Sequence, residues 1–295
     1  MTTQMDHIRA EALPGLEGRP FWLMDGIGNN FVIVDLRGGG QMTPKAAAML
    51  GDHDGPFGCD QIITLERGEN EASPYMGIWN ADGSPAGACG NATRCVGWLL
   101  MQETGLASAH LSSPAGPLLA KDAGPYRVTV DMGTPRLDWQ DIPLSEQMDD
   151  TRYIDIKLGP IDAPVLWGPS AVNMGNPHCV FFVEDAEKAQ IEKFGPLVEN
   201  HPLFPEQSNV SVVHAIDQET LRLRTWERGV GMTAACGTAA CAALVSAHRR
   251  RVTGRRATIK LDGGELVIEW RHSDDHVLMT GPISLNGIGR FEEAR

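Results

Sequence analysis

Two cysteine-glycine pairs, Cys89-Gly90 and Cys236-Gly237, could carry the chemistry of this chain. Each pair is followed by an alanine-containing run that is typical of a helix. A thiol in the first turn of a helix has a pKa below the free value of about 8.5, because the helix N–H groups favour the thiolate. The adjacent glycine lets a ligand approach the backbone closely. Each pair therefore predicts a reactive thiol beside an anion-binding helix start.

Two such thiols indicate a two-base reaction at a carbon atom. If one thiolate removes a proton and the opposite thiol returns one to the other face, the carbon inverts its configuration. The enolate-like charge formed in between is stabilised by N–H donors at the two helix starts. No lysine lies in a setting that indicates a Schiff base, and no GxGxxG motif indicates a nucleotide. We therefore expect no cofactor, and in particular no pyridoxal phosphate.

The other cysteines are expected to be small buried apolar residues; they are Cys59, Cys95, Cys179 and Cys241. Structural zinc sites favour cysteine pairs with about two to four intervening residues, and their ligands must converge on one point. Cys89 and Cys95 are further apart than that, and Cys236 and Cys241 lie along one predicted helix. The sequence therefore predicts no metal site.

An internal repeat relates the two pairs. Gly28-Asn29 recurs as Gly175-Asn176, and Cys89 and Cys236 each lie 61 residues after that glycine. Further matches follow at the same offset of 147 residues: Trp79 with Trp226, Asn80 with Glu227, Gly90 with Gly237 and Ala92 with Ala239. Matches in one register without a gap indicate two homologous halves.

The pattern of each half is strand-rich before the cysteine and helical after it. Short β-branched and aromatic runs predict strands at 21–35, 75–79, 126–132, 180–185, 209–216, 221–227, 258–270 and 276–281. Alanine-rich runs predict helices at 91–105 and 238–250, with peripheral helices at 44–50 and 184–200. We expect an α+β fold of two pseudo-symmetric domains, each a curved, barrel-like, mainly antiparallel sheet around a central helix, with the active site in the interdomain cleft.

The predicted boundary between the halves lies in the polar, proline-punctuated stretch 133–152. Residues 1–19 are expected to be a flexible N-terminal extension. Residues 20–133 form the predicted first domain, which the C-terminal segment 282–295 joins, and residues 134–281 form the second.

Charge and hydropathy exclude several partners. With 25 Lys+Arg against 38 Asp+Glu, the formal net charge of −13 would repel a phosphate backbone, so we expect no nucleic acid. No apolar stretch has the length of a signal peptide or a membrane span, so we expect no membrane association and a cytoplasmic location. The expected partner is a small amino-acid substrate.

Six stretches in the chain resemble the diaminopimelate epimerase family, in the same order and over nearly the whole chain: GIGNNFVIVD, CDQI, WNADGSPAGACGNATRC, NMGNPHCV, SNVSVV and WERGVGMTAACGTAACAA. The resemblance implies a cofactor-independent homodimeric isomerase that interconverts LL- and meso-diaminopimelate for lysine and peptidoglycan synthesis. It also implies two domains that close over the substrate.

The resemblance also assigns residues. Cys89 and Cys236 match the acid/base pair, and His178 and Glu227 match residues that hold the substrate amino group and assist the thiols. The residues matching substrate contacts are Asn29, Gln61, Asn80, Asn176, Asn209 and Arg228. Those matching the helix starts that hold the α-carboxylate are Gly90, Asn91, Gly237 and Thr238. A substrate with two zwitterionic ends suits this set, since Asn both donates and accepts while Arg grips a carboxylate.

Departures from the family pattern leave alternatives open. Ala92 and Ala239 stand where the family usually has glycine, Met232 where an acid is common, and Asn30 where Asp is usual. A proline or hydroxyproline racemase or epimerase uses similar paired thiols on a related fold. A non-catalytic amino-acid-binding protein and a thiol-disulfide redox protein are further alternatives, although neither cysteine belongs to a CxxC motif.

Overall fold

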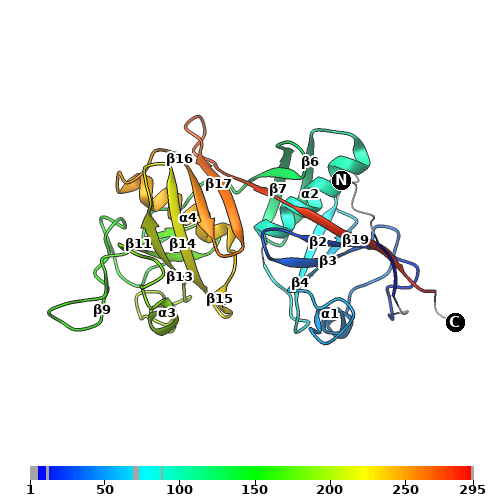
Figure 1. The fold of residues 1–295 in the computed structure, drawn as a ribbon, viewed down its shortest axis with the longest axis horizontal. Helices are drawn as coiled ribbons and strands as arrows, with labels where there is room; N and C mark the ends of the chain where they lie inside the picture. Colours follow the sequence, from blue (N-terminus) through cyan, green and yellow to red (C-terminus); the bar gives the residue numbers. More distant parts are fainter. Residues whose placement is uncertain (1–5, 11–12, 69–72, 88, 294–295) are drawn as a thin grey trace. The chain divides into compact units, whose positions relative to one another are not determined.

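The structure is a computed structural model that describes residues 6–10, 13–68, 73–87 and 89–293. The described chain divides into two compact units (Figure 1). The first unit runs to Val130 and resumes at Gly281, and the second comprises Asp131–Thr280. Within the described part of the chain, every helix is too short or too polar to span a bilayer.

The first unit contains these elements in chain order: β1 (Asp6–Ala10), β2 (Pro20–Asp25), β3 (Asn30–Asp35), α1 (Pro44–Gly51), β4 (Gln61–Glu66), β5 (Tyr75–Asn80), α2 (Gly90–Thr104), β6 (Ser108–Ser113), β7 (Gly116–Asp122), β8 (Arg127–Asp131) and β19 (Ser284–Phe291). The second unit contains β9 (Lys157–Leu158), β10 (Leu166–Trp167), β11 (Ser170–Asn173), β12 (Pro177–Phe182), α3 (Ile191–Glu199), β13 (Asn209–Ala215), β14 (Thr220–Glu227), β15 (Gly231–Thr233), α4 (Gly237–Arg249), β16 (Arg256–Leu261), β17 (Gly264–Trp270) and most of β18 (Val277–Pro282).

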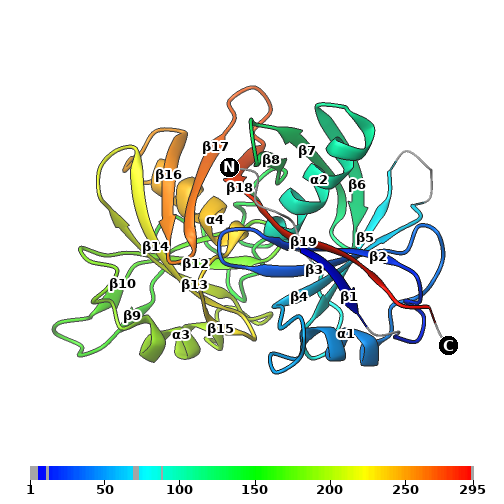
Figure 2. The same cartoon turned by 45° about the vertical axis from the view of Figure 1, so that its right-hand side comes forward.

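The first unit is a mixed sheet with the strand order β1-β19-β2-β3-β4-β5-β6-β7-β8. Besides the parallel pair β1-β19, β3 runs parallel to β4 and β5 parallel to β6, while the neighbours β19-β2, β2-β3, β4-β5 and β6-β7 are antiparallel. These parallel pairs were not predicted. The pairs β3-β4 and β5-β6 arise because α1 joins β3 to β4 and α2 joins β5 to β6, and a helical crossover returns the chain in the same direction. In Figure 2, α2 lies beside β6 and β7, which it contacts, while α1 packs on β4 and β5.

The second unit repeats this plan with the order β11-β12-β13-β14-β16-β17-β18, and β15 pairs with the end of β14. Here β12 runs parallel to β13 and β14 parallel to β16. The central helix α4 contacts six strands of the sheet: β11, β12, β13, β14, β16 and β17. Its small residues allow this close wrapping, because Ala239, Ala240, Ala242 and Ala243 are all fully buried. Helix α3 packs on the other side, against β13, β14 and β15.

The two units share one arrangement of elements. Strand β12 begins 147 residues after β3, and α4 begins 147 residues after α2, as the sequence repeat requires. Both helices begin directly after a predicted reactive cysteine. The predicted α+β fold of two pseudo-symmetric halves, each a mainly antiparallel sheet around a central helix, is therefore confirmed.

The segment expected as a flexible N-terminal extension contributes to the first unit where it is described. Residues Asp6–Ala10 form β1, which pairs in parallel with β19. Leu16 is fully buried and packs in a core with Phe21 and Phe291. Residues 1–5 and 11–12 of that extension lie outside the described residues.

Candidate functional site

Polar residues occupy the same register positions at one end of both sheets. In the first unit, Phe31 pairs with Gln61, and Gln61 pairs with Asn80. Residues paired in this way direct their side chains to the same face of the sheet. The three positions lie on neighbouring strands, so the predicted residues Gln61 and Asn80 are brought together at one sheet end.

The second unit has the corresponding row. His178 pairs with Asn209, and the pairing of Val210 with Trp226 makes Asn209 and Glu227 the next pair along the two strands. The row of Phe31, Gln61 and Asn80 is thus matched by His178, Asn209 and Glu227. Asn80 ends β5, the last strand before α2, and Glu227 ends β14, from which β15 leads to α4.

Cys89 is the N-cap of α2. Its backbone is extended, with φ −151 and ψ 101, and its Sγ accepts a hydrogen bond from the N–H of Ala92 at 3.4 Å. The same sulfur lies 3.8 Å from Oδ1 of Asn29, which precedes β3. Cys89 is half-buried. The Cys89 thiol therefore accepts one hydrogen bond at the helix start and donates another to the side chain of Asn29.

The polar side chains predicted as site residues in the first unit form two separate sets of hydrogen bonds. Asn29 donates from Nδ2 to Asp60 Oδ2 at 3.1 Å. Gln61 donates to Asn80 Oδ1 at 3.2 Å, and Asn80 in turn donates to Ser84 Oγ at 3.1 Å. Asp60 was not predicted as a site residue. Its place directly before Gln61 was the available signal, since it sits at the same strand end.

Asn91 is placed differently from the other predicted residues of the first unit. It lies in the first turn of α2 and is only 3% exposed. Its Oδ1 accepts a hydrogen bond from Nη1 of Arg94, a fully buried arginine, at 3.0 Å. Its amide oxygen therefore bonds to the protein, and the backbone at Gly90 and Asn91 forms the helix start.

Cys236 is the N-cap of α4 and is buried, with 5% of its surface exposed. Its Sγ lies 3.5 Å from Oγ1 of Thr238. Burial and the neighbouring Glu227 carboxylate raise the pKa of the Cys236 thiol well above its usual value. Glu227 is held by Thr233, whose hydroxyl donates to Oε1 at 2.6 Å. Cys236 is therefore a protonated thiol at neutral pH, and the lowered pKa that its place at a helix start predicted is wrong.

His178 is completely buried in β12. Its Nε2 lies 2.9 Å from Oδ1 of Asn176, so the ring donates from Nε2 and leaves Nδ1 as an acceptor. Nδ1 has no hydrogen-bond partner among the described residues. Burial, with a smaller effect from the positive charge of Arg228, lowers the pKa of His178 to about 3. The imidazole is therefore neutral at physiological pH.

Asn209 joins two strand ends. It is 2% exposed, donates to the carbonyl of Pro177 at 3.0 Å, and accepts from the backbone N–H of Arg228 at 3.1 Å. The Arg228 guanidinium donates to the carbonyl of Glu206 at 2.8 Å and is only half-buried. Asn209 thus fixes the backbone of Arg228 while the side chain of Arg228 reaches the surface.

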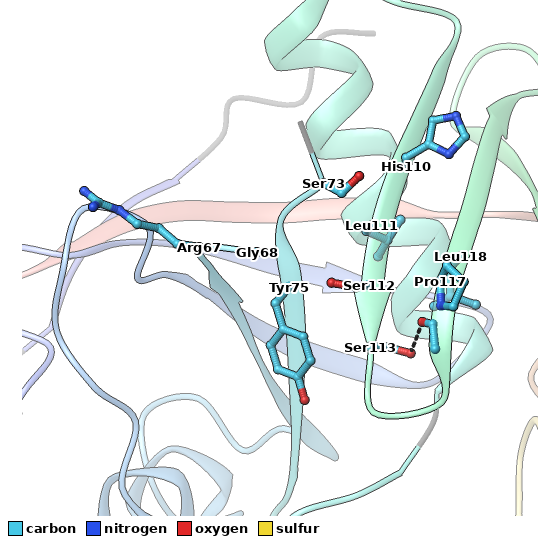
Figure 3. Close-up of a pocket in the computed structure, with 11 residues that line it drawn as sticks. Arg67, Gly68, Ser73, Tyr75, His110, Leu111, Ser112, Ser113, Pro117 and Leu118 are labelled. Atoms are coloured by element: carbon cyan, nitrogen blue, oxygen red, sulfur yellow. Dashed lines mark hydrogen bonds between the residues drawn. The ribbon is translucent and has the colours of Figure 1, made fainter. Parts of the chain in front are cut away.

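A hollow elsewhere on the first unit contains none of the predicted site residues (Figure 3). It lies beside β5 and the β6–β7 hairpin, and Tyr75 and His110 are among its lining residues. The hydroxyl of Ser113 donates across the hairpin to the carbonyl of Gly116 at 3.1 Å. The predicted site residues therefore lie apart from this hollow.

Comparison with known proteins identifies relatives of the whole chain. The family profile described as diaminopimelate epimerase matches residues 21–137 and 170–286. A diaminopimelate epimerase from Afipia carboxidovorans is 48% identical over 279 residues, which cover 94% of this chain and 96% of the relative. One from Brucella anthropi is 50% identical over 278 residues, which cover 93% of this chain and 92% of the relative.

Solved structures of low identity share the fold. A predicted epimerase from Pseudomonas aeruginosa has a TM-score of 0.65 at 16% identity, covering 92% of this chain and 98% of that chain. A hydroxyproline epimerase from Agrobacterium vitis has a TM-score of 0.59 at 16% identity, covering 92% of this chain and 91% of that chain. The two-unit architecture is thus common to these proteins.

Proposed function

Because the chain belongs to the diaminopimelate epimerase family, we propose that it interconverts LL- and meso-diaminopimelate by proton transfer between two cysteines. One observation carries the proposal. Cys89 and Cys236 are the N-caps of corresponding helices in two equivalent units, so each thiol lies beside an N-terminal helix turn.

In this mechanism one thiolate removes the α-proton of the substrate, and the other thiol donates its proton to the opposite face. The electron pair of the broken C–H bond passes through an enolate-like intermediate to the new C–H bond. One cysteine ends protonated and the other ends as a thiolate, so the reverse reaction needs the same two groups. The mechanism requires both thiols to reach one α-carbon from opposite faces.

The environments of the two thiols support a division of roles. Burial and Glu227 keep Cys236 protonated, so Cys236 is the proton donor in the resting enzyme. Cys89 accepts an N–H bond from its helix, which stabilises negative charge on its sulfur, so we assign Cys89 the role of the base. The isomer whose α-proton faces Cys89 is then the substrate of the resting form.

The two units offer binding groups for the α-carboxylate and the α-ammonium group of the substrate. We assign the α-carboxylate to the helix starts at Gly90-Asn91 and Gly237-Thr238, because N-terminal N–H groups bind anions. The unpartnered Nδ1 of neutral His178 and the carboxylate of Glu227 are acceptors for the α-ammonium group. The further proposed substrate contacts are Asn29, Gln61, Asn80, Asn176, Asn209 and Arg228.

Arg228 is assigned to the distal end of the substrate. Its guanidinium is half-buried and donates from Nη1 to the Glu206 carbonyl, which leaves further N–H groups for a carboxylate. A proline substrate has no distal carboxylate and would gain nothing from this group. Relatives named diaminopimelate epimerase are 48% and 50% identical to this chain, which also supports this substrate over proline derivatives.

We also propose that the protein is a cytoplasmic homodimer serving lysine and peptidoglycan precursor synthesis. All six cysteines are free thiols, as a reducing compartment would keep them. The product of the proposed reaction is a diamino diacid, which supports a role in amino-acid biosynthesis.

Proton NMR of LL-diaminopimelate with the reduced protein in D₂O tests the proposal. We expect the α-proton signal to decay while the meso isomer forms. If no exchange occurs, the proposed reaction is wrong, and proline and hydroxyproline under the same conditions would test the racemase alternative. Thermal stabilisation by diaminopimelate without any exchange would instead indicate a binding protein.

A further inference from the structure

Glu199, the last residue of α3, is a buried carboxylate with both oxygens engaged beside the candidate site. Its exposed fraction is 8%. Oε2 accepts a hydrogen bond from the indole N–H of Trp226 at 2.7 Å. Oε1 accepts from the backbone N–H of Gly229, also at 2.7 Å. The two oxygens therefore bond to the residues on either side of the pair Glu227-Arg228.

The packing of α3 explains why this carboxylate reaches the turn. Helix α3 contacts β13, β14 and β15 (Figure 1). It carries glycine at position 195, where a Cβ would lie 2.6 Å from Cγ of Trp226. Gly195 and Glu199 are four residues apart and share a helix face. The helix backbone thus lies directly against the indole, and this brings the carboxylate one turn later to the residues that flank Glu227.

From these contacts we propose that Glu199 is a positioning residue that fixes the turn after β14 and thereby orients Glu227 and Arg228. The inference rests on the proposed function, in which those two residues contact the substrate. A carboxylate is suited to this task because it accepts both hydrogen bonds and donates none. Buried charge-assisted bonds of this kind are short and directional.

The first unit holds its corresponding turn in a different way. After β5, the N–H of Asn80 donates to the carbonyl of Ser84 at 2.8 Å, and Ser84 donates to Asp82 Oδ1. That turn is closed by its own residues. The position that corresponds to Glu199 at the offset of 147 is Asp52, which is exposed and accepts from the N–H of Asp54. The external carboxylate anchor therefore belongs to the unit that carries Glu227.

The variant Glu199→Gln tests the inference in the full-length protein. The amide keeps the size of the side chain but presents one acceptor and one donor, so it can bond only one of the two N–H groups. We expect kcat for diaminopimelate to fall by about 10- to 100-fold, through misplaced Glu227, and KM to rise, through misplaced Arg228. The Trp226 indole N–H resonance should shift, and hydrogen exchange at the Gly229 amide should accelerate.

Two further variants separate positioning from general stability. Trp226→Phe keeps the aromatic packing and removes one of the two bonds, so a smaller loss in kcat is expected even if Glu199→Gln folds poorly. Glu192→Gln is the matched control, because Glu192 lies on the same helix and pairs with Arg224 on the surface. It should retain the wild-type kcat and KM.

A double variant shows whether Glu199 acts through Glu227. If it does, Glu199→Gln added to Glu227→Gln lowers kcat no further than Glu227→Gln alone. If the losses in kcat of the two single variants multiply in the double variant, the inference is wrong. It is also wrong if Glu199→Gln and Trp226→Phe fold and retain wild-type kinetics. If the wild type itself fails to epimerise diaminopimelate, the proposed function falls, and the inference falls with it.

Discussion

His178 holds in the second unit the strand position that Phe31 holds in the first. Each is the second residue of its strand, and each is buried, with 0% and 1% exposure. Phe31 pairs with Gln61, and His178 pairs with Asn209. One half of the repeat thus keeps a phenyl ring where the other keeps a neutral imidazole. This difference makes the two equivalent strand positions chemically unequal.

The buried imidazole predicts a pH-dependent stability that the substitution His178→Phe would abolish. The pKa of His178 is lowered to about 3, whereas an unfolded histidine titrates near 6.5. Between these two pKa values the unfolded state binds a proton on this histidine and the folded state does not. The free energy of unfolding is therefore at its full value above pH 6.5 and decreases as the pH falls. From pH 7 to 5.5 the loss from this group is about 1 kcal/mol.

Urea unfolding of the wild type and His178→Phe at both pH values measures this loss. The variant should show a smaller drop between pH 7 and pH 5.5 than the wild type. Equal drops in the two proteins would contradict a buried, neutral His178.

Removal of either cysteine should stop epimerisation but leave a one-sided reaction. With Cys89→Ala or Cys236→Ala, we expect a loss of about 100- to 10,000-fold in epimerisation, because general acid or base catalysis is removed. The remaining thiol can still exchange the α-proton on its own face, so the two variants should exchange the α-protons of opposite isomers in D₂O.

NMR with LL- and meso-diaminopimelate follows both reactions. Cys59→Ala is the control, since Cys59 is buried and bonds to the Leu50 carbonyl; it should retain wild-type activity. Full epimerisation by either catalytic variant would refute the two-thiol mechanism.

The duplicated sequence context explains why the two helix starts could be predicted. Cys89 and Cys236 each follow the repeated glycine by the same distance, and both prove to be N-caps. The predicted first-turn residues Asn91 and Thr238 also lie within those helices. Local signals sufficed because a cap and its helix are contiguous in the chain.

Long-range pairing explains what the sequence could not provide. At the offset of 147, Asn209 falls on Ile62, yet the strand register makes Gln61 its counterpart. The span from the start of α3 to the start of β13 is one residue longer than the span from the start of α1 to the start of β4, and only the pairing of strands reveals that shift. Glu199 was missed for a similar reason, because its role depends on how α3 packs against Trp226 and not on any local motif.

The carboxylate of Glu227 should control the acidity of Cys236. A negative charge beside a thiol disfavours the thiolate, so Glu227→Gln should lower the pKa of Cys236. Alkylation of Cys236 by iodoacetamide should then begin at a lower pH than in the wild type. Peptide mass spectrometry across a pH series follows this reaction.

Cys59 provides an internal reference in the same sample. Burial raises the pKa of Cys59 to about 11, and Cys59 lies in the first unit, so its alkylation profile should be unchanged by Glu227→Gln. If the profile of Cys236 also stays in place, Glu227 does not hold that thiol protonated.

Ala92 and Ala239 should contribute to stability at equivalent positions of α2 and α4. Both are fully buried, and both stand where the family usually has glycine. Each change to glycine increases the backbone entropy of the unfolded chain and removes a packed methyl, so Ala92→Gly and Ala239→Gly should each cost about 1 kcal/mol. For units of this size that corresponds to a fall in Tm of about 2–4 °C. Differential scanning calorimetry of the single variants measures these changes in Tm.

Ala48→Gly is the control, because Ala48 lies on the peripheral helix α1 and the change there tests helix propensity without a neighbouring cysteine. An unchanged or higher Tm for Ala92→Gly or Ala239→Gly would mean that the two methyl groups strain the helix starts. Their role would then be sought in KM for diaminopimelate.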